Sequence, residues 1–178
     1  MKKIELLSNP NKKPEAAFLA ICSKAPVWKD YEGISEQDAN KDIPLTLMIN
    51  RWDGLIGFPG GQVEDGETAI QAAVREAYEE VGVVVQESEI QPLASYEFSI
   101  VAHLFVIEIS YEQILSIYKN IPNSKHFGSE ITGAFLAHLC NYKKGKGIRK
   151  LLDSGLAKSV REELIDLMNF VYASDVEG

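Results

Sequence analysis

This 178-residue chain has few cysteines, no long apolar run and fewer basic than acidic residues, and each of these features excludes a class of protein. Two cysteines, Cys22 and Cys140, are too few for a disulfide scaffold. Both lie in apolar stretches, so we expect buried free thiols in a reducing compartment. No apolar run reaches the roughly 18 residues of a membrane-spanning helix, so we expect no membrane partner. The formal net charge of −8 argues against non-specific binding to duplex nucleic acid.

The remaining composition is that of a globular protein. Hydrophobic residues make up 46% of the chain and charged residues 25%, so we expect a single domain over residues 1–178. The first seven residues are too short and too polar for a signal peptide, which favours a cytoplasmic location. Residues 23–44 form a polar insertion, long for a compact domain, which is expected to act as a lid or a mobile loop. Within it, Trp28 and Tyr31 either stack on a ligand or pack the loop onto the body.

Apolar runs and helical periodicity alternate along the chain and predict a mixed α/β protein. Strands are expected at residues 16–22, 45–49, 100–109 and 131–139, and helices at 68–81, 111–119 and 159–172. Gly82 is expected to stop the first helix. No internal repeat or shift of composition marks a second domain. The fold class is therefore α/β, an α/β/α sandwich with a mixed central sheet.

The acidity is concentrated in one segment. Residues 61–83 contain six acidic residues and one basic residue. Glu76, Glu79 and Glu80 lie at i, i+3 and i+4 of the expected helix, so their carboxylates share one face. Three clustered carboxylates repel one another and need a compensating cation. Oxygen ligands favour Mg²⁺ or Mn²⁺, and such ions bind substrate phosphates, which suits attack of an activated water on phosphorus.

Residues around these carboxylates have expected supporting roles. Arg75 can pair with Glu79 four residues later and fix its carboxylate. Glu67 opens the helix and can reach back toward the metal or the preceding glycine turn. Gly60 and Gly61 permit a close approach of the backbone to a ligand.

The spacing of these residues resembles the signature of the Nudix hydrolases, G-x5-E-x7-R-E-U-x-E-E-x-G-U, where U is a bulky apolar residue. Every fixed position is present, and Ala77 is smaller than the usual aliphatic residue. The resemblance implies an α/β/α sandwich that hydrolyses a nucleoside diphosphate linked to another moiety. It also implies metal ligation by the three glutamates, the Gly61 carbonyl and, as an accessory ligand, Glu67.

A narrower resemblance extends over roughly residues 45–167. The stretch RWDGLIGFPGG, the triplet VAH, the loop KHFGSEI and the helix start SVREEL are similar to segments of the Nudix subgroup that decaps snoRNA and hydrolyses inosine diphosphate. The subgroup has a histidine near Phe18 that helps to hold the purine, and its absence here puts a preference for inosine or guanine in doubt. Phe18 and the glycine loop at Gly60 are still expected to contact substrate. The subgroup also implies a homodimer.

The same resemblance points to residues outside the signature. Glu130 matches a carboxylate that joins the helix cluster, either as a metal ligand or as a general base. Arg51 is expected to bind substrate phosphate, with an ion pair to Asp53 as the alternative. Trp52 is interpreted as a core residue in preference to a base contact, and His126 is a candidate for substrate binding.

The other two histidines are interpreted as structural. His103 lies within an apolar strand, where a hydrogen-bonded core histidine is the expected state, and His138 is interpreted in the same way.

The sequence therefore predicts a Mg²⁺- or Mn²⁺-dependent hydrolase acting on a diphosphate linkage of a nucleotide. One alternative is a decapping hydrolase of capped RNA, for which the basic residues Lys143, Lys144, Lys146, Arg149 and Lys150 provide a phosphate-binding patch if they are more than a solvated loop. A non-catalytic nucleotide-binding module is a remote alternative, because no metal-binding glutamate is missing. Nothing points to a Nudix-fold isomerase.

Overall fold

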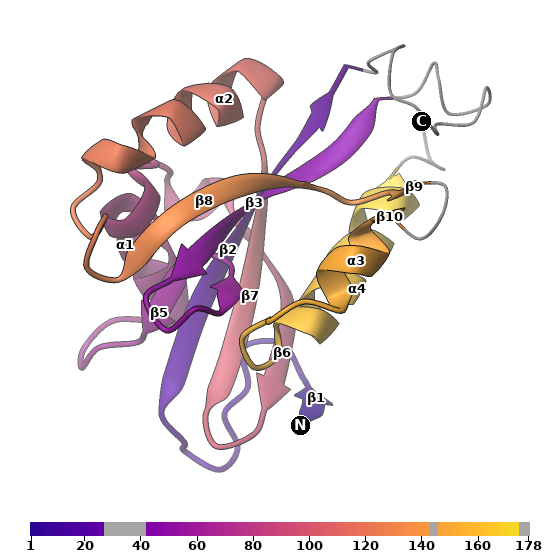
Figure 1. The fold of residues 1–178 in the computed structure, drawn as a ribbon. Helices are drawn as coiled ribbons and strands as arrows, with labels where there is room; N and C mark the ends of the chain where they lie inside the picture. The colour runs from indigo at the N-terminus through magenta and orange to yellow at the C-terminus, as the bar shows by residue number, and fades with distance from the viewer. Residues whose placement is uncertain (27–41, 143–145, 175–178) are drawn as a thin grey trace.

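A mixed β-sheet flanked by helices on both faces forms the body of the protein (Figure 1). The computed structural model describes residues 1–26, 42–142 and 146–174. Eight strands form the main sheet, in the order β1-β6-β7-β2-β3-β4, with β5 paired to β2 and β8 paired to β3. Strands β2 and β7 run parallel, whereas the other strand pairs of this sheet are antiparallel. The sheet is therefore mixed, as predicted.

The strands have the following bounds: β1 Lys2–Ile4, β2 Glu15–Ala25, β3 Ile43–Arg51, β4 Ile56–Gly57, β5 Gly60–Gln62, β6 Gln91–Glu97, β7 Val101–Glu108 and β8 Ile131–His138, with a separate hairpin of β9 Asn141–Tyr142 and β10 Lys146–Gly147. The helices are α1 Ala69–Val81, α2 Tyr111–Asn120, α3 Ile148–Leu152 and α4 Val160–Ser174, with short 3₁₀ turns at Glu87–Glu89 and Ile121–Asn123.

Two hydrophobic cores lie on opposite faces of the sheet. Helices α1 and α2 cover one face, where Ala73, Ala77 and Ile114 are fully buried against strand residues such as Leu19. Helices α3 and α4 cover the other face, where residues such as Leu164 pack against the sheet. Alternate residues of β2 and β7 enter each core, because side chains of a strand point to opposite faces in turn. This arrangement is the α/β/α sandwich that the sequence predicts.

The predicted elements are confirmed, with differences at their ends. Helix α1 begins after Thr68, whose hydroxyl accepts from Gln71 N at 3.4 Å, and it ends at Gly82, whose φ is 70°. Strand β6 was not predicted from the sequence, because Pro92 and its polar neighbours obscure the alternation. The bounds of the expected insertion were too wide, since residues 23–25 belong to β2 and residues 43–44 belong to β3. Residues 27–41, with Trp28 and Tyr31, lie outside the described residues.

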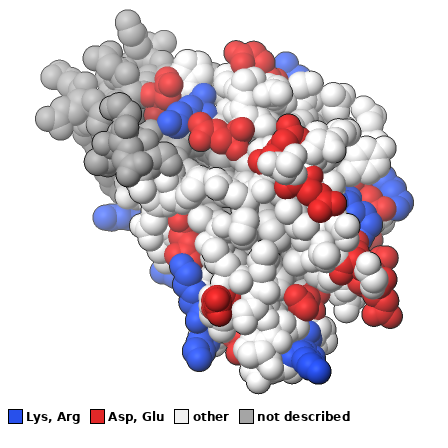
Figure 2. Space-filling view, turned by 180° about the vertical axis from the view of Figure 1, so that it is seen from behind, with Lys and Arg blue, Asp and Glu red and all other residues white. Residues whose placement is uncertain are grey.

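Both cysteines are free thiols, as expected, although only Cys22 is buried and Cys140 is half-buried. None of the helices in the described ranges combines the length and the apolar character needed to cross a membrane. Figure 2 shows acidic side chains spread over the face opposite to that of Figure 1, with lysines and arginines in small separate groups.

Four segments meet at one end of the sheet and define a candidate site. They are β5, the polar face of α1, the turn between β3 and β4, and the loop formed by residues 124–130 that leads into β8. The pairing of β5 with β2 sets the glycine pair beside α1, and the pairing of β8 with β3 sets the loop beside the β3–β4 turn.

Candidate active site

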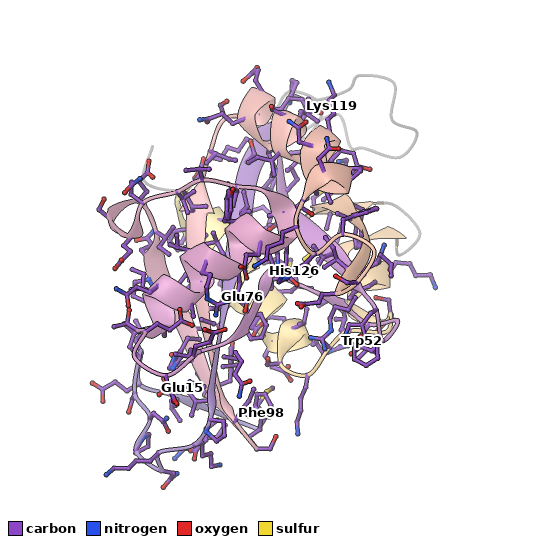
Figure 3. The ribbon with its side chains drawn as sticks, turned by 90° about the vertical axis from the view of Figure 1, so that its left-hand side faces the viewer. Glu15, Trp52, Glu76, Phe98, Lys119 and His126 are labelled. Atoms are coloured by element: carbon purple, nitrogen blue, oxygen red, sulfur yellow. The ribbon has the colours of Figure 1, made fainter. Side chains whose placement is uncertain are left out.

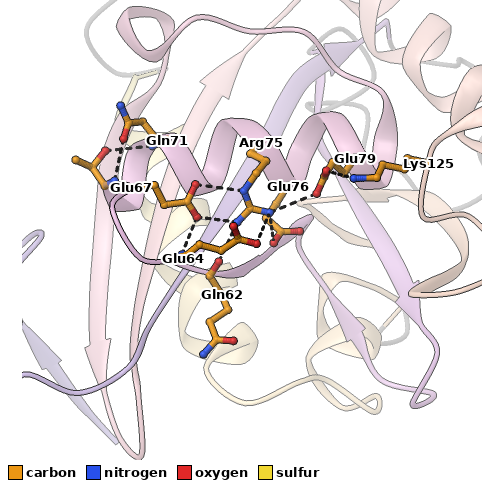
Figure 4. A network of polar contacts seen from close by, with 9 residues as sticks. Gln62, Glu64, Glu67, Gln71, Arg75, Glu76, Glu79 and Lys125 are labelled. Atoms are coloured by element: carbon orange, nitrogen blue, oxygen red, sulfur yellow. Dashed lines mark hydrogen bonds and ion pairs between the residues drawn. The ribbon is translucent and has the colours of Figure 1, made fainter.

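Arg75 is the centre of a network of carboxylates on α1 (Figure 4). Its guanidinium donates to both oxygens of Glu67, at 2.7 and 3.2 Å, and to Gln62 O at 3.0 Å. It also donates to Glu76 Oε1 at 2.8 Å and to Glu79 Oε2 at 3.3 Å. The pairing with Glu79 confirms the prediction from the i, i+4 spacing. The hydrogen bond from Arg75 holds the pKa of Glu67 below its usual value, and the carboxylates raise the pKa of Arg75.

Glu79 is held between two cations. One carboxylate oxygen pairs with Arg75, and the other accepts a hydrogen bond from the Lys125 ammonium group. This hydrogen bond is the main reason that the pKa of Glu79 lies below its usual value. The sequence analysis missed Lys125, because the partner lies 46 positions away and no periodicity connects the two residues.

Glu76 and Glu80 are buried beneath α1, and each adjoins one glycine of strand β5. Glu76 packs against Gly61, which has no room for a side chain, and Glu80 accepts a hydrogen bond from Gly60 N at 2.8 Å. Burial raises the pKa of Glu80 to about 8, and the charges of Glu76 and Glu130 add to the shift. Burial also raises the pKa of Glu76 despite the opposing bond from Arg75. Both carboxylates are therefore costly to ionise without a cation beside them.

The loop 124–130 brings a histidine and a third carboxylate to the same place. One ligand atom each of Glu76, His126 and Glu130 lies within 4.8 Å of the other two. Figure 3 shows Glu76 and His126 beside one another, with Trp52 projecting away from the body nearby. The structure thus unites two of the predicted helix ligands, Glu76 and Glu80, with Glu130 from the late loop. Glu67 and Glu79 lie in the adjoining network of Arg75.

A cavity of about 170 Å³ opens beside these carboxylates. It is lined by Ile49, Arg51, Trp52, Phe58, Gly60, Gly61, Glu80 and Glu130. Pockets that bury a whole small molecule measure roughly 300–1,000 Å³. The cavity therefore suits only part of a nucleotide, such as its phosphates, and the remainder would lie on the rim. Phe58, which the sequence analysis did not single out, is fully buried beside this cavity.

Arg51 and Trp52 form the side of the cavity that the β3–β4 turn supplies. Arg51 pairs with Asp53, its Nη2 lying 2.8 Å from Oδ2, which is the alternative that the sequence allowed. It nevertheless lines the cavity, so the ion pair and access to a ligand coexist. The interpretation of Trp52 as a core residue was wrong, since 68% of its surface is exposed. The turn that follows β3 carries Trp52 beyond the sheet, where no core can form around it.

The remaining candidates lie further from the carboxylates. Phe18 is half-buried against the α4 side of the sheet, directly behind Gly60, and does not line the cavity. His103 is fully buried, with Nδ1 2.9 Å from Ser95 Oγ and Nε2 2.8 Å from Glu15 Oε2, which confirms it as a core histidine. His138 is half-buried in β8, and burial lowers its pKa.

The residues present fit a divalent cation. After burial, the charge of Glu130 contributes to the raised pKa of both Glu76 and Glu80, and the charge of Glu76 contributes to that of Glu80. Arg75, which contacts Glu76 Oε1, also pairs with Glu67 and Glu79. The donor set of carboxylate oxygens and an imidazole nitrogen is one that divalent metals use in proteins.

Solved structures of other proteins share the fold of this chain. The fold of a mutT/nudix family protein from Listeria innocua superimposes with a TM-score of 0.63, at 16% identity over 96% of this chain and 100% of that chain. An Ap4A hydrolase from C. elegans gives a TM-score of 0.55, at 16% identity over 90% of this chain and 98% of that chain. At such identities the likeness shows the fold alone.

Residues 37–171 match the family described as Nudt16-like, U8 snoRNA-decapping enzyme-like, and the chain belongs to this family of Nudix hydrolases. A U8 snoRNA-decapping enzyme of Homalodisca vitripennis is 34% identical over 109 residues, which are 58% of this chain and 57% of that protein. A U8 snoRNA-decapping enzyme of Mus musculus is 27% identical over 131 residues, 68% of this chain and 67% of that protein. The chain thus spans between about half and two thirds of the length of these two relatives.

Proposed function

We propose that this chain is a divalent-metal-dependent hydrolase that cleaves a diphosphate linkage in a nucleoside diphosphate derivative. The observation that carries the proposal is the convergence of the Glu76, Glu80 and Glu130 carboxylates at a cavity that Arg51 also lines. Like charges at such a site favour a cation, and the arginine suits the phosphates that a cation would accompany. Membership of a Nudix hydrolase family supports the same reaction.

The metal-binding role falls to Glu76, Glu79, Glu80 and Glu130, with the Gly61 carbonyl and Glu67 as further oxygen donors. Mg²⁺ or Mn²⁺ suits such oxygen ligands. When bound, the cation would neutralise charge on phosphate oxygens and lower the pKa of a water molecule. Arg75 positions Glu67, Glu76 and Glu79 through four hydrogen bonds, so the carboxylates are arranged before substrate arrives.

Substrate binding falls to the rim of the cavity. Arg51 can exchange its ion pair with Asp53 for a phosphate, because a guanidinium binds carboxylate and phosphate with the same paired geometry. The exposed ring of Trp52 offers a flat surface on which a nucleobase stacks. The cavity is too small for a whole nucleotide, which agrees with phosphates bound inside it and a base bound outside it. Substrate contacts by Gly60, Phe18 and His126 stay predictions.

The test is a substrate panel with Mg²⁺ and with Mn²⁺. The panel contains nucleoside di- and triphosphates, including the inosine forms, and ADP-ribose, NADH, FAD, dinucleoside polyphosphates and capped RNA. Glu80→Gln keeps the shape and the acceptor for Gly60 N while it removes the charge. Glu5→Gln, at an exposed position in the N-terminal region, is the matched control. Turnover of one class that is lost in Glu80→Gln and kept in Glu5→Gln supports the proposal, and absence of turnover throughout refutes it.

Hydrolysis of capped RNA is the second candidate function. It is favoured by the relatives, which are named U8 snoRNA-decapping enzymes. Of the basic cluster, Arg149 and Lys150 are exposed on α3, and residues 143–145 lie outside the described residues. Binding through phosphate contacts weakens steeply with salt. A steep loss of activity with salt on capped RNA, combined with a weak salt effect on free nucleotides, would favour this substrate.

A non-catalytic nucleotide-binding module is the remote alternative, and it would bind metal and nucleotide in the panel without turnover.

Two further proposals concern the oligomeric state and the location of the protein. Assembly as a homodimer is checked by light scattering of the full chain. A cytoplasmic location is checked by fractionation of the source cells.

A further inference from the structure

His126 is held at the carboxylate cluster by its own loop. Its backbone N donates to Glu79 O at 3.1 Å, which attaches the loop to the last turn of α1. Its carbonyl accepts from Glu130 N at 3.0 Å and from both the backbone N and the hydroxyl of Ser129, at 3.2 and 3.0 Å. The backbone of residue 126, from which the imidazole projects, is therefore fixed by hydrogen bonds at both its N and its O atom. Such a residue is suited to a precise role in the site.

The imidazole lies among potential metal ligands. A ring nitrogen of His126, a carboxylate oxygen of Glu76 and a carboxylate oxygen of Glu130 lie within 4.8 Å of one another. Nδ1 is 3.2 Å from Glu130 Oε2, but the two atoms lack the alignment of a hydrogen bond. Within the described ranges, this buried nitrogen has no hydrogen-bond partner. A buried ring nitrogen without a partner is unusual, and it indicates a group that binds something further.

Glu76 is prepared for the same ligand. Arg75 donates to Glu76 Oε1 at 2.8 Å and orients the carboxylate, in the manner of groups that support metal ligands from behind. The backbone of Glu130 is fixed as well, because its carbonyl oxygen accepts a hydrogen bond from Trp52 N at 3.0 Å. The Glu76 side chain and the backbones of His126 and Glu130 are thus each held by a hydrogen bond from outside the group.

We propose that His126 is a nitrogen ligand of the catalytic metal, which it binds together with Glu76 and Glu130. The proposal rests on the metal dependence argued under Proposed function and adds a consequence for the choice of metal. Mg²⁺ prefers oxygen ligands, whereas imidazole binds Mn²⁺ and the later divalent transition metals more readily. The imidazole adds a nitrogen donor to the carboxylate ligands argued above, and it therefore favours Mn²⁺ or Co²⁺ over Mg²⁺.

The test is pulsed electron paramagnetic resonance of the full chain with Mn²⁺ alone. A directly bound imidazole gives a ¹⁴N modulation of the Mn²⁺ echo. The chain has three histidines, and His103 is buried between Ser95 and Glu15, so His138 supplies the matched control. We expect the modulation in the parent and in His138→Gln, and its loss in His126→Gln. We also expect Mn²⁺ affinity to fall about tenfold or more in His126→Gln, with a change below about twofold for Mg²⁺, because the remaining ligands are oxygens.

The result that overturns the proposal is Mn²⁺ binding to the parent without ¹⁴N modulation, a modulation that persists in His126→Gln, or no Mn²⁺ binding at all. An ion pair between His126 and Glu130 without a metal role would give the first of these results. His126→Phe, whose ring fills the same space, and a circular dichroism melt of each variant separate ligand loss from misfolding. A modulation without hydrolysis of any nucleotide would refute the proposed function alone, and hydrolysis in Mn²⁺ without modulation would refute the histidine ligand alone.

Discussion

Gly61 packs directly against Glu76: a Cβ atom at residue 61 would lie 2.4 Å from Glu76 Oε1 and 2.6 Å from its Cδ. The glycine therefore sets the position of a buried carboxylate. We predict that Gly61→Ala displaces this carboxylate and leaves the fold intact, because the displaced atoms are the end of a side chain. Mn²⁺ affinity and kcat/KM should each fall about tenfold or more.

Calorimetric titration with Mn²⁺ and steady-state kinetics measure both effects of Gly61→Ala. Gly155→Ala is the control, since its Cβ would meet Leu55 Cδ2 at an ordinary 3.9 Å. Parent-like Mn²⁺ affinity in Gly61→Ala would contradict the positioning role of the glycine.

Arg75 should be irreplaceable by lysine, although both residues are cations. Its planar group reaches Glu67, Glu76 and Glu79 at once, whereas an ammonium group is a single point of charge. We expect Arg75→Lys to lower the free energy of unfolding by about 2 kcal/mol, the scale of lost hydrogen bonds between charged groups. Urea unfolding measures the change, and Arg149→Lys at an exposed position is the control. Equal urea midpoints for parent and Arg75→Lys would disprove the role of the planar guanidinium group.

Trp52 should contribute to substrate affinity and leave the chemical step unchanged. Removing a ring on which one base stacks costs about 1–3 kcal/mol. We therefore expect Trp52→Ala to raise KM by roughly 5- to 150-fold and to leave kcat within about twofold, as expected for a contact made equally in ground and transition states. The measurement is a kinetic comparison on the preferred nucleotide, with the exposed Tyr118→Ala as control. An unaltered KM would count against stacking on Trp52.

Glu163 should make stability depend on pH. It is fully buried in α4, one carboxylate oxygen accepts from Ser159 Oγ at 2.8 Å, and the other has no hydrogen-bond partner among the described residues. Burial raises its pKa from 4.5 to about 8. The unfolded chain releases this proton near pH 4.5 and the folded chain near pH 8, so the group lowers stability progressively as pH rises between those values.

Glu163→Gln removes this ionisation and keeps the shape of the side chain. We expect parent and variant to have similar stability near pH 4.5, and the variant to be the more stable at pH 8. The difference should grow by at most roughly 1.4 kcal/mol per pH unit. Urea midpoints at intervals between these pH values measure it, with Glu112→Gln in the exposed first turn of α2 as control. Parallel pH profiles for parent and Glu163→Gln would show that the carboxyl ionises normally.

Local signals made much of the fold and part of the site predictable. Helix α1 begins with a capping box at Thr68 and ends at Gly82, and its face of glutamates follows from spacing alone. The same spacing led to the pairing of Arg75 with Glu79. Such features depend on residues close in sequence, so the spacing of those residues is enough to indicate them.

Contacts between distant segments could not be predicted in this way. Neither the hydrogen bond from Lys125 to Glu79 nor the approach of His126 to Glu76 follows from any periodicity, because both depend on the path of the loop before β8. The exposure of Trp52 was also missed, since an aromatic residue after an apolar strand resembles a core residue until the turn is known. The division into one domain and the metal ligands, within the signature and beyond it, stay predictions.

The hydrogen bond from Trp52 N to Glu130 O joins two parts of the site that could otherwise have changed independently. Trp52 carries the aromatic ring at the rim of the cavity, and Glu130 carries a carboxylate of the cluster. A mutation that shifts the turn after β3 would therefore shift the carboxylate as well. In the divergence of this family, a change of base preference by that route would be inherited together with a change at the metal site.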